Sequence, residues 1–99
     1  MSKRSQQIAD ALDRLAPKLS PQDRTEVIEH ALWSKGLHQA SADKAAWLSL
    51  VAYIRHNFTD YEALLEEGYG PEAARHFCAE QINTALATLD CRKKIPADE

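Results

Sequence analysis

Five side chains that could do chemistry are gathered within seven residues near the middle of the chain. They form the pattern Arg55-His56-x-x-Thr59-Asp60-Tyr61. A guanidinium can hold a phosphate or carboxylate through two parallel hydrogen bonds, and an imidazole can act as an acid or a base near neutral pH. A helix that begins after Thr59 would add free backbone N–H groups. The pattern therefore predicts a small-ligand or anion site at this junction, which could be catalytic.

The same pair of residue types recurs at Arg75-His76. We expect this pair on the last helix, where it would join the first cluster if that helix packs against the junction. A purely structural interpretation competes with this one. Thr59 and Asp60 suit a helix N-terminus, and His76 has glutamates one turn away on both sides, as a solvated helix residue often has. Clustered titratable groups arise in structural networks as well as in active sites, so both interpretations stay open.

Metal and cofactor chemistry is not indicated. His56 and Asp60 are four residues apart, but a helix break separates them, so they need not share a face. The chain has no Cys-x-x-Cys or His-Glu-x-x-His pattern and no glycine-rich phosphate loop after a strand. No serine or cysteine has the partners that activate a nucleophile. We therefore expect no metal site and no cofactor, and a binding protein rather than an enzyme.

The helix that positions the cluster is expected to follow the cap Ser41 and to contain the longest apolar run, AAWLSLVAYIRHNF at residues 45–58. At 100° per residue, its bulky side chains form one stripe that should face the core. This stripe contains Trp47, Leu50, Val51, Ile54 and Phe58. The opposite side is mostly small and ends at His56; it contains Ala45, Ser49 and Ala52. We therefore expect this helix to pack on two sides.

Four further helices are predicted around it. One spans Ser5 to Ala16, with Ile8 and Leu12 on its apolar stripe. A second runs from the cap Ser20 to about Lys35, with Gly36 just beyond its end. Thr59-Asp60-Tyr61-Glu62 reads as a capping box that starts a short helix ending at Gly68, with Phe58 as its staple residue. The last begins at Pro71. The fold class is therefore all-α: a compact orthogonal bundle of about five helices around a central apolar helix.

Length and composition predict one soluble domain over residues 1–99, with flexible ends at 1–4 and 92–99. Hydrophobic residues make up 44% and charged residues 27%. Cys78 and Cys91 are too far apart along a helix to pair, which favours a reducing compartment. No apolar run suits a signal peptide or a membrane span. We expect a cytoplasmic protein without a membrane partner.

The charge pattern disfavours nucleic acid as the partner. The net charge is −3, and no stretch reads as a broad basic footprint. Nucleic-acid contact through the basic chain ends, residues 1–24 and 92–94, remains a second alternative if the fold brings those ends together.

The last two-thirds of the chain resembles a family of small, mainly bacterial proteins classed as a domain of unknown function. The resemblance is carried by Leu37-His38-Gln39-Ala40-Ser41, Ala46-Trp47-Leu48, Tyr53 to Tyr69 and Ala74-Arg75-His76-Phe77. Its most specific part is the Arg-His-x-x-Thr-Asp-Tyr block. The resemblance implies no activity, because the family has none assigned.

A protein-interaction module is the function that we favour from the sequence. Trp33 falls off the apolar stripe of its helix, near Glu26 and His30. Either the following loop covers the indole, or Trp33 and His30 form an exposed anchor for an unknown protein partner or a second copy. The module would then be non-catalytic, and the ligand site at Arg55, His56 and Asp60 is the alternative.

Overall fold

The computed structural model describes residues 3–95, and all regular secondary structure within that range is helical. The elements in chain order are α1 (Lys3–Leu15), α2 (Pro21–Trp33), the 3-10 turn η1 (Lys35–Leu37), α3 (Ala42–Phe58), α4 (Tyr61–Glu66) and α5 (Pro71–Thr88). The prediction of an all-α fold with five helices is confirmed for this part of the chain.

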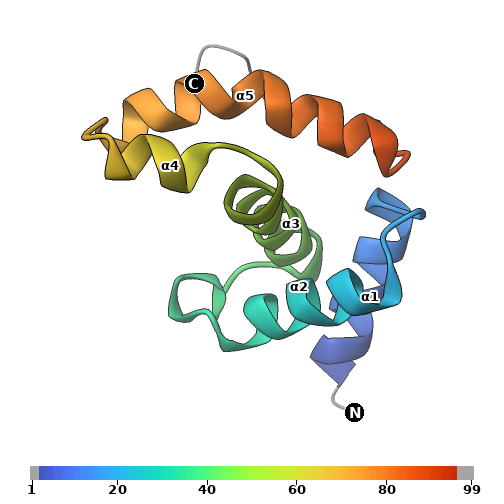
Figure 1. Cartoon of the computed structure of the whole chain (residues 1–99). Coiled ribbons are helices and arrows are strands. Elements are labelled where there is room, and N and C mark those ends of the chain that lie inside the picture. Colours follow the sequence, from blue (N-terminus) through green and yellow to red (C-terminus); the bar gives the residue numbers. More distant parts are fainter. Residues whose placement is uncertain (1–2, 96–99) are drawn as a thin grey trace.

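Helix α3 lies at the centre of the molecule. Figure 1 shows α3 nearly along its axis, with α1 and α2 on one side and α4 and α5 on the other. Helix α5 runs across α3 (Figure 1). The radius of gyration is 13.5 Å, close to the value of about 13 Å expected for a folded chain of 100 residues. The central helix therefore packs on two sides, as predicted from its face of bulky side chains and its opposite face of small ones.

Local capping signals set several helix ends where they were predicted. The hydroxyl of Ser20 accepts a hydrogen bond from the backbone N–H of Asp23 (3.2 Å), and Ser41 accepts one from Lys44 (3.1 Å). Each bond satisfies one of the free N–H groups in the first turn. Gly68 ends α4 with a φ of +103°, the left-handed conformation that glycine adopts without strain.

Two predicted helix boundaries were wrong. Helix α1 spans Lys3–Leu15 rather than residues 5–16. Helix α2 ends at Trp33 rather than near Lys35, because Ser34 turns into an extended conformation while its N–H still bonds to the carbonyl of His30. Gly36 consequently lies inside η1 and does not serve as the residue that ends α2.

The core follows the predicted stripes except at one end of α3. Ile8, Leu12, Leu50 and Ile54 are fully buried, and Trp47 is partly buried against them. The prediction that Phe58 faces the core was wrong, because its side chain is 52% exposed. Phe58 is the last residue of α3, where the chain turns away into α4, and its ring contacts only the edge of this core through Tyr53, at 6.1 Å between ring centroids.

Both ends of the described chain are attached to the helices. The two terminal nitrogens of Arg4 donate hydrogen bonds to the carbonyls of Ala40 and Leu37, each at 2.9 Å. The backbone of Ile95 exchanges two hydrogen bonds of 2.9 Å with the side chain of Asn83. The rest of the ends predicted to be flexible, residues 1–2 and 96–99, lies outside the described residues.

Candidate functional site

The junction between α3 and α4 is held by hydrogen bonds of Thr59 and Asp60. The Thr59 hydroxyl donates to the carbonyl of Arg55 (2.5 Å) and accepts from the N–H of Tyr61 (3.2 Å). Gln81 on α5 donates to the Asp60 carboxylate (2.9 Å) and accepts from the Asp60 N–H (3.0 Å). Thr59 and Asp60 therefore connect elements of the fold, which is the structural interpretation of these two residues.

The predicted capping box does not form. Asp60, not Thr59, is the residue that precedes the first turn of α4. The carboxylate of Glu62 pairs with Nδ1 of His56 and so is not engaged with the Thr59 backbone. Glu62 pairs with His56 instead of with the backbone at the start of α4, because the turn after α3 places the imidazole beside the glutamate.

Arg55 lies half-buried beside the junction. Its guanidinium carbon is 5.6 Å from the centre of the Tyr61 ring, within the range of a cation–π contact. Its Nε atom is buried and has no hydrogen-bond partner in residues 3–95. Burial lowers the pKa of Arg55, and the nearby charge of Arg75 lowers it further. A buried donor without a partner is costly, so this nitrogen is a candidate to bind a ligand acceptor.

Arg75 joins Arg55 at one hollow between α3 and α5. The hollow has a volume of about 490 Å³. Its lining is formed by Trp47, Leu48, Val51, Arg55, Glu72, Arg75, Ile82 and Ile95. Two arginines from different helices thus line one hollow beside an apolar wall, and one carboxylate, Glu72, offsets part of their charge. The packing of α5 on α3 brings Arg75 to the hollow that Arg55 lines, and a shared ligand of the two residues stays a prediction.

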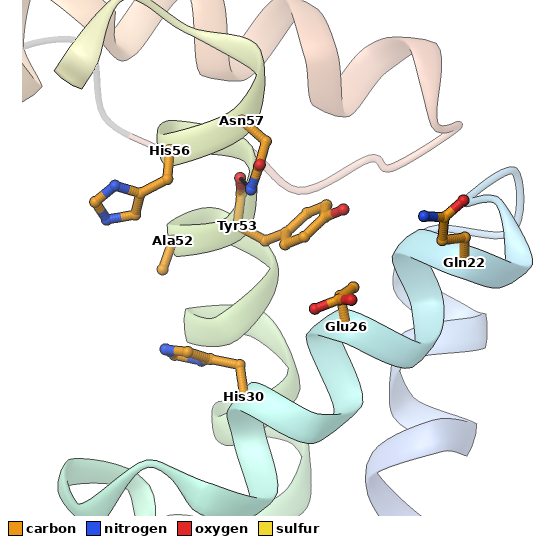
Figure 2. A pocket seen from close by; sticks show the side chains of 7 residues that line it. All are labelled: Gln22, Glu26, His30, Ala52, Tyr53, His56 and Asn57. Atoms are coloured by element: carbon orange, nitrogen blue, oxygen red, sulfur yellow. Dashed lines mark hydrogen bonds between the residues drawn. The ribbon is translucent and has the colours of Figure 1, made fainter. Parts of the chain in front are cut away.

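His56 faces a different hollow, on the α2 side of α3. This hollow has a volume of about 500 Å³. Figure 2 shows the imidazoles of His30 and His56 on one side of it, with Ala52 between them, and the Tyr53 ring and Glu26 on the other. His30 Nδ1 lies 2.9 Å from the hydroxyl of the fully buried Ser49. Sequence reasoning placed Ser49 and His56 on one face of α3, but nothing in the sequence indicated that His30 would meet that face.

The hollow lined by His30 and His56 lacks the ligand set of a metal centre in the part of the chain that the structure describes. No group of three His, Cys, Asp or Glu side chains within residues 3–95 is arranged to hold a metal ion. His56 is engaged by Glu62 and lies edge-on to the Tyr61 ring, 5.3 Å between ring centres. The Arg55-His56 pair is therefore divided: Tyr61 contacts both side chains, but only the arginine lines the hollow with Arg75.

His76 does not join either hollow. It is exposed on α5 and lies against Phe77, with ring centres 5.7 Å apart. Phe77 in turn contacts Tyr69 at 5.4 Å, and both of these rings are about half exposed. The interpretation of His76 as a solvated helix residue fits this position better than a role beside Arg75.

Trp33 is the most exposed large apolar residue of the described chain. Its side chain is 82% exposed at the end of α2. The explanation that the following loop covers it was wrong, because the chain leaves α2 through Ser34 into η1 without folding over the indole. His30, the other predicted interface residue, is exposed one turn earlier but bonds to Ser49.

The basic residues near the two chain ends do approach one another. The backbone N–H of Lys18 bonds to the carbonyl of Leu89 (3.3 Å), and Arg14, Arg92 and Lys93 line one shallow hollow. Much of their charge is already paired within the protein. Arg14 binds Asp43 at 3.1 Å, and the Lys93 ammonium lies 4.6 Å above the Trp47 ring.

No helix within residues 3–95 has the length and apolar character needed to cross a bilayer.

Comparison with known proteins places the chain in a family. The family described as "Uncharacterized conserved protein (DUF2293)" matches residues 11–89, a span that contains the whole α3–α5 hollow except Ile95. No curated protein and no solved structure matches the chain. The family description names no activity, in agreement with the resemblance seen in the sequence. Because the match covers most of the chain, the protein belongs to this family of uncharacterised conserved proteins.

Proposed function

We propose that the protein is a non-catalytic interaction module that associates with a second copy of itself through Trp33. The observation that carries the proposal is the 82% exposure of this indole. The second tryptophan, Trp47, shows the contrast, since it is partly buried and covered by Lys93. Tryptophan is enriched among the residues that dominate binding energy, because its ring removes a large apolar area from water at a small entropic cost.

The charges beside Trp33 support self-association over another partner. Glu29 precedes the indole by one helical turn and Lys35 follows it, and both side chains are exposed. In a two-fold symmetric dimer the same patch faces itself, so a residue of one copy meets a different residue of the other. A patch with both signs of charge around an aromatic centre is therefore complementary to itself.

Sedimentation over a concentration series tests the proposal. We expect a concentration-dependent dimer that the Trp33→Ala variant loses. Phe58→Ala is the matched control, because Phe58 is also an exposed aromatic, 52% exposed, on another part of the surface. A wild-type protein that stays monomeric up to millimolar concentration would overturn the proposal, and so would equal losses in both variants.

A second candidate function is the binding of a small anion at Arg55 and Arg75. It is supported by two observations: Arg55 and Arg75 line one hollow, and the buried Nε of Arg55 has no hydrogen-bond partner in residues 3–95. An oxyanion there would accept a hydrogen bond from that nitrogen and screen the repulsion between the two arginines.

Inorganic phosphate is a suitable probe for this site. We expect the NMR signal of the Arg55 Nε–Hε group to shift as phosphate is added, and the shift to be lost in Arg75→Gln. Arg92→Gln removes the same charge from an exposed residue outside this hollow and should leave the titration unchanged. Identical titrations of the two variants would exclude the site.

We also propose a cytoplasmic location for the protein. Cys78 and Cys91 are buried free thiols, which supports a reducing, cytoplasmic location. A mainly bacterial origin is what the family resemblance implies. Fractionation of cells that express the tagged protein tests the location, and recovery in an oxidising compartment would contradict it.

A further inference from the structure

The hollow on the α2 side of α3 is lined by side chains whose hydrogen-bond donors are largely used within the protein. We call it the α2–α3 hollow, and its lining consists of Gln22, Glu26, His30, Ala52, Tyr53, His56 and Asn57. The Tyr53 hydroxyl donates to Asp23 (2.5 Å), and the Asn57 amide donates to the backbone carbonyl of Tyr53 (2.9 Å). These bonds leave the amide oxygen of Asn57 as an acceptor.

The pairing of His56 with Glu62 makes a further acceptor. An ionised carboxylate can only accept a hydrogen bond, so Nδ1 of His56, which pairs with it, carries the hydrogen. In the neutral ring, Nε2 is then an acceptor. The lining of the α2–α3 hollow is therefore richer in acceptors than in donors.

The charge of the α2–α3 hollow has the same preference. Among the described residues that line it, Glu26 is the one carboxylate, and no lysine or arginine is present. Figure 2 shows Glu26 and the Tyr53 ring on one side of the hollow and the two imidazoles on the other. With neutral imidazoles the lining carries a negative charge. The hollow between α3 and α5 shares no lining residue with it and carries two arginines, so the two hollows favour ligands of opposite charge.

Size and order also suit a small ligand. The volume of about 500 Å³ falls within the range of small-molecule sites. Ala52 leaves space between the imidazoles, and the Tyr53 ring offers a face on which a cation can pack. Both imidazoles are held by protein partners, His30 by the hydroxyl of Ser49 and His56 by Glu62. The lining is thus positioned before a ligand binds, which lowers the cost of ordering it.

We propose that the α2–α3 hollow binds a small organic cation, an alkylammonium or alkylguanidinium, whose charge is neutralised by Glu26 and whose alkyl chain packs on Tyr53. Such a head group brings several N–H donors and no acceptor, which matches a lining of acceptors. A metal ion does not match, because no three ligating side chains within residues 3–95 are arranged to hold one. The proposal depends neither on association through Trp33 nor on the anion site.

The probes are n-butylammonium and n-butylguanidinium, added at about pH 8, where histidine is ordinarily neutral. NMR of the histidine Cε1–Hε1 groups follows the titration. We expect the signals of His30 and His56 to shift and saturate with both probes. His38 and His76 are exposed outside the hollow and should not shift, so they serve as references in the same sample. Butyrate, with an alkyl chain but the opposite charge, should leave all four signals in place.

Three variants locate the bound cation. Glu26→Gln removes the charge at nearly constant shape and should weaken binding about tenfold, because hydrogen bonds to charged groups are the stronger ones. Glu29→Gln is the matched control, since it removes an exposed charge from the same helix outside the hollow. Ala52→Leu fills the space between the imidazoles without changing the charge and should abolish the shifts.

Several outcomes would overturn the proposal. One is the absence of saturable shifts at His30 and His56 with both cations, and another is equal shifts of all four histidines. Equal affinities of Glu26→Gln and Glu29→Gln would remove the role of the carboxylate. A capped tripeptide with a central lysine presents the same ammonium on a larger body. Tighter binding of this peptide than of n-butylammonium would assign the hollow to a lysine side chain of a partner protein instead of a small cation.

Discussion

The hydroxyl of Tyr53 on α3 donates a hydrogen bond to the carboxylate of Asp23 on α2, at 2.5 Å. This bond is the main reason why the pKa of Tyr53 is raised to about 12, with burial as the second cause. Together with the contact between His30 and Ser49, it links α2 to α3 by polar groups as well as by apolar packing.

Replacing Tyr53 by phenylalanine tests the strength of this link. We expect Tyr53→Phe to lower the free energy of unfolding by about 1.5 kcal/mol, because a hydrogen bond to a charged group is worth about 1.5–3 kcal/mol and this one is only partly buried. Urea denaturation at neutral pH measures the change. Tyr69→Phe removes the hydroxyl of a tyrosine that is 45% exposed and should leave stability unchanged. Equal effects of the two variants would contradict the role of Asp23.

Wild type and Tyr53→Phe should also differ in how their stability depends on pH. The pKa of Tyr53 is raised in the folded state from its ordinary value of 10.0 to about 12. Its stabilising contribution is therefore complete below about pH 10 and is lost as the pH rises through about 12. The difference in unfolding free energy between wild type and Tyr53→Phe should shrink over this window. If the difference in unfolding free energy stayed constant over this pH window, the pKa of Tyr53 would not be raised in the folded state.

The ion pair between Asp13 and Arg24 should stabilise the fold weakly and only above acidic pH. Its hydrogen bond lowers the pKa of Asp13, so the contribution is present above the ordinary carboxyl value of 3.8 and is lost as the pH falls through the lowered one. Both side chains are more than a third exposed, which limits the effect to below about 1 kcal/mol. We expect Asp13→Asn to destabilise the protein at pH 7 but not at about pH 2, as followed by thermal unfolding. Asp43→Asn, which breaks the more exposed pair with Arg14, should have a smaller effect.

The backbone at Asp90 predicts a stabilising substitution. Asp90 has a φ of 64°, which costs an L-residue about 1 kcal/mol and costs glycine little. We expect Asp90→Gly to raise the unfolding midpoint by about 5 °C. Gly68→Ala tests the reverse, since Gly68 has a φ of +103° and open space around an added Cβ, so only the backbone is strained. Scanning calorimetry measures both, and a lower midpoint for Asp90→Gly would contradict the interpretation.

The two thiols should be protected in the folded protein. Cys78 is fully buried and Cys91 is 7% exposed. We expect slow alkylation of both in native buffer and rapid alkylation in denaturant, with Cys91 modified before Cys78, because it lies in the segment after α5. Mass spectrometry after short pulses of iodoacetamide distinguishes the sites. Faster modification of Cys78 would show that α5 opens more readily than the segment behind it.

Much of the fold could be predicted because its signals are local. The periodicity that places Ile8, Leu12 and Leu50 inside and the caps Ser20 and Ser41 depend on neighbouring residues alone, and these predictions were confirmed. Phe58 and Glu62 were predicted wrongly because their environments depend on distant partners. The apolar stripe of α3 continues to Phe58, but the chain leaves the core at that residue. Glu62 pairs with His56 instead of with the backbone at the start of α4.

The candidate site was predictable only in part, for a geometric reason. Arg55 and His56 are adjacent on a helix, so their side chains point about 100° apart and cannot easily serve one small ligand. The meeting of Arg55 with Arg75 requires α5 to cross α3 at one particular place, which the sequence pattern does not specify. The hollow of His30 and His56 has the same origin, since it depends on where α2 crosses α3.

The central position of α3 has a consequence for how the protein opens. Helices α1 and α2 pack on α3 and on each other, whereas α5 packs on α3 and α4. The part formed by α4 and α5 can therefore detach as a unit while the other three helices stay together. Native-state hydrogen exchange should then divide the amides into two groups, with those of α4 and α5 exchanging at lower denaturant concentration. Detachment of α4 and α5 would disassemble the hollow between α3 and α5 before the protein unfolds globally. A ligand bound in that hollow would therefore hold the two groups of helices together.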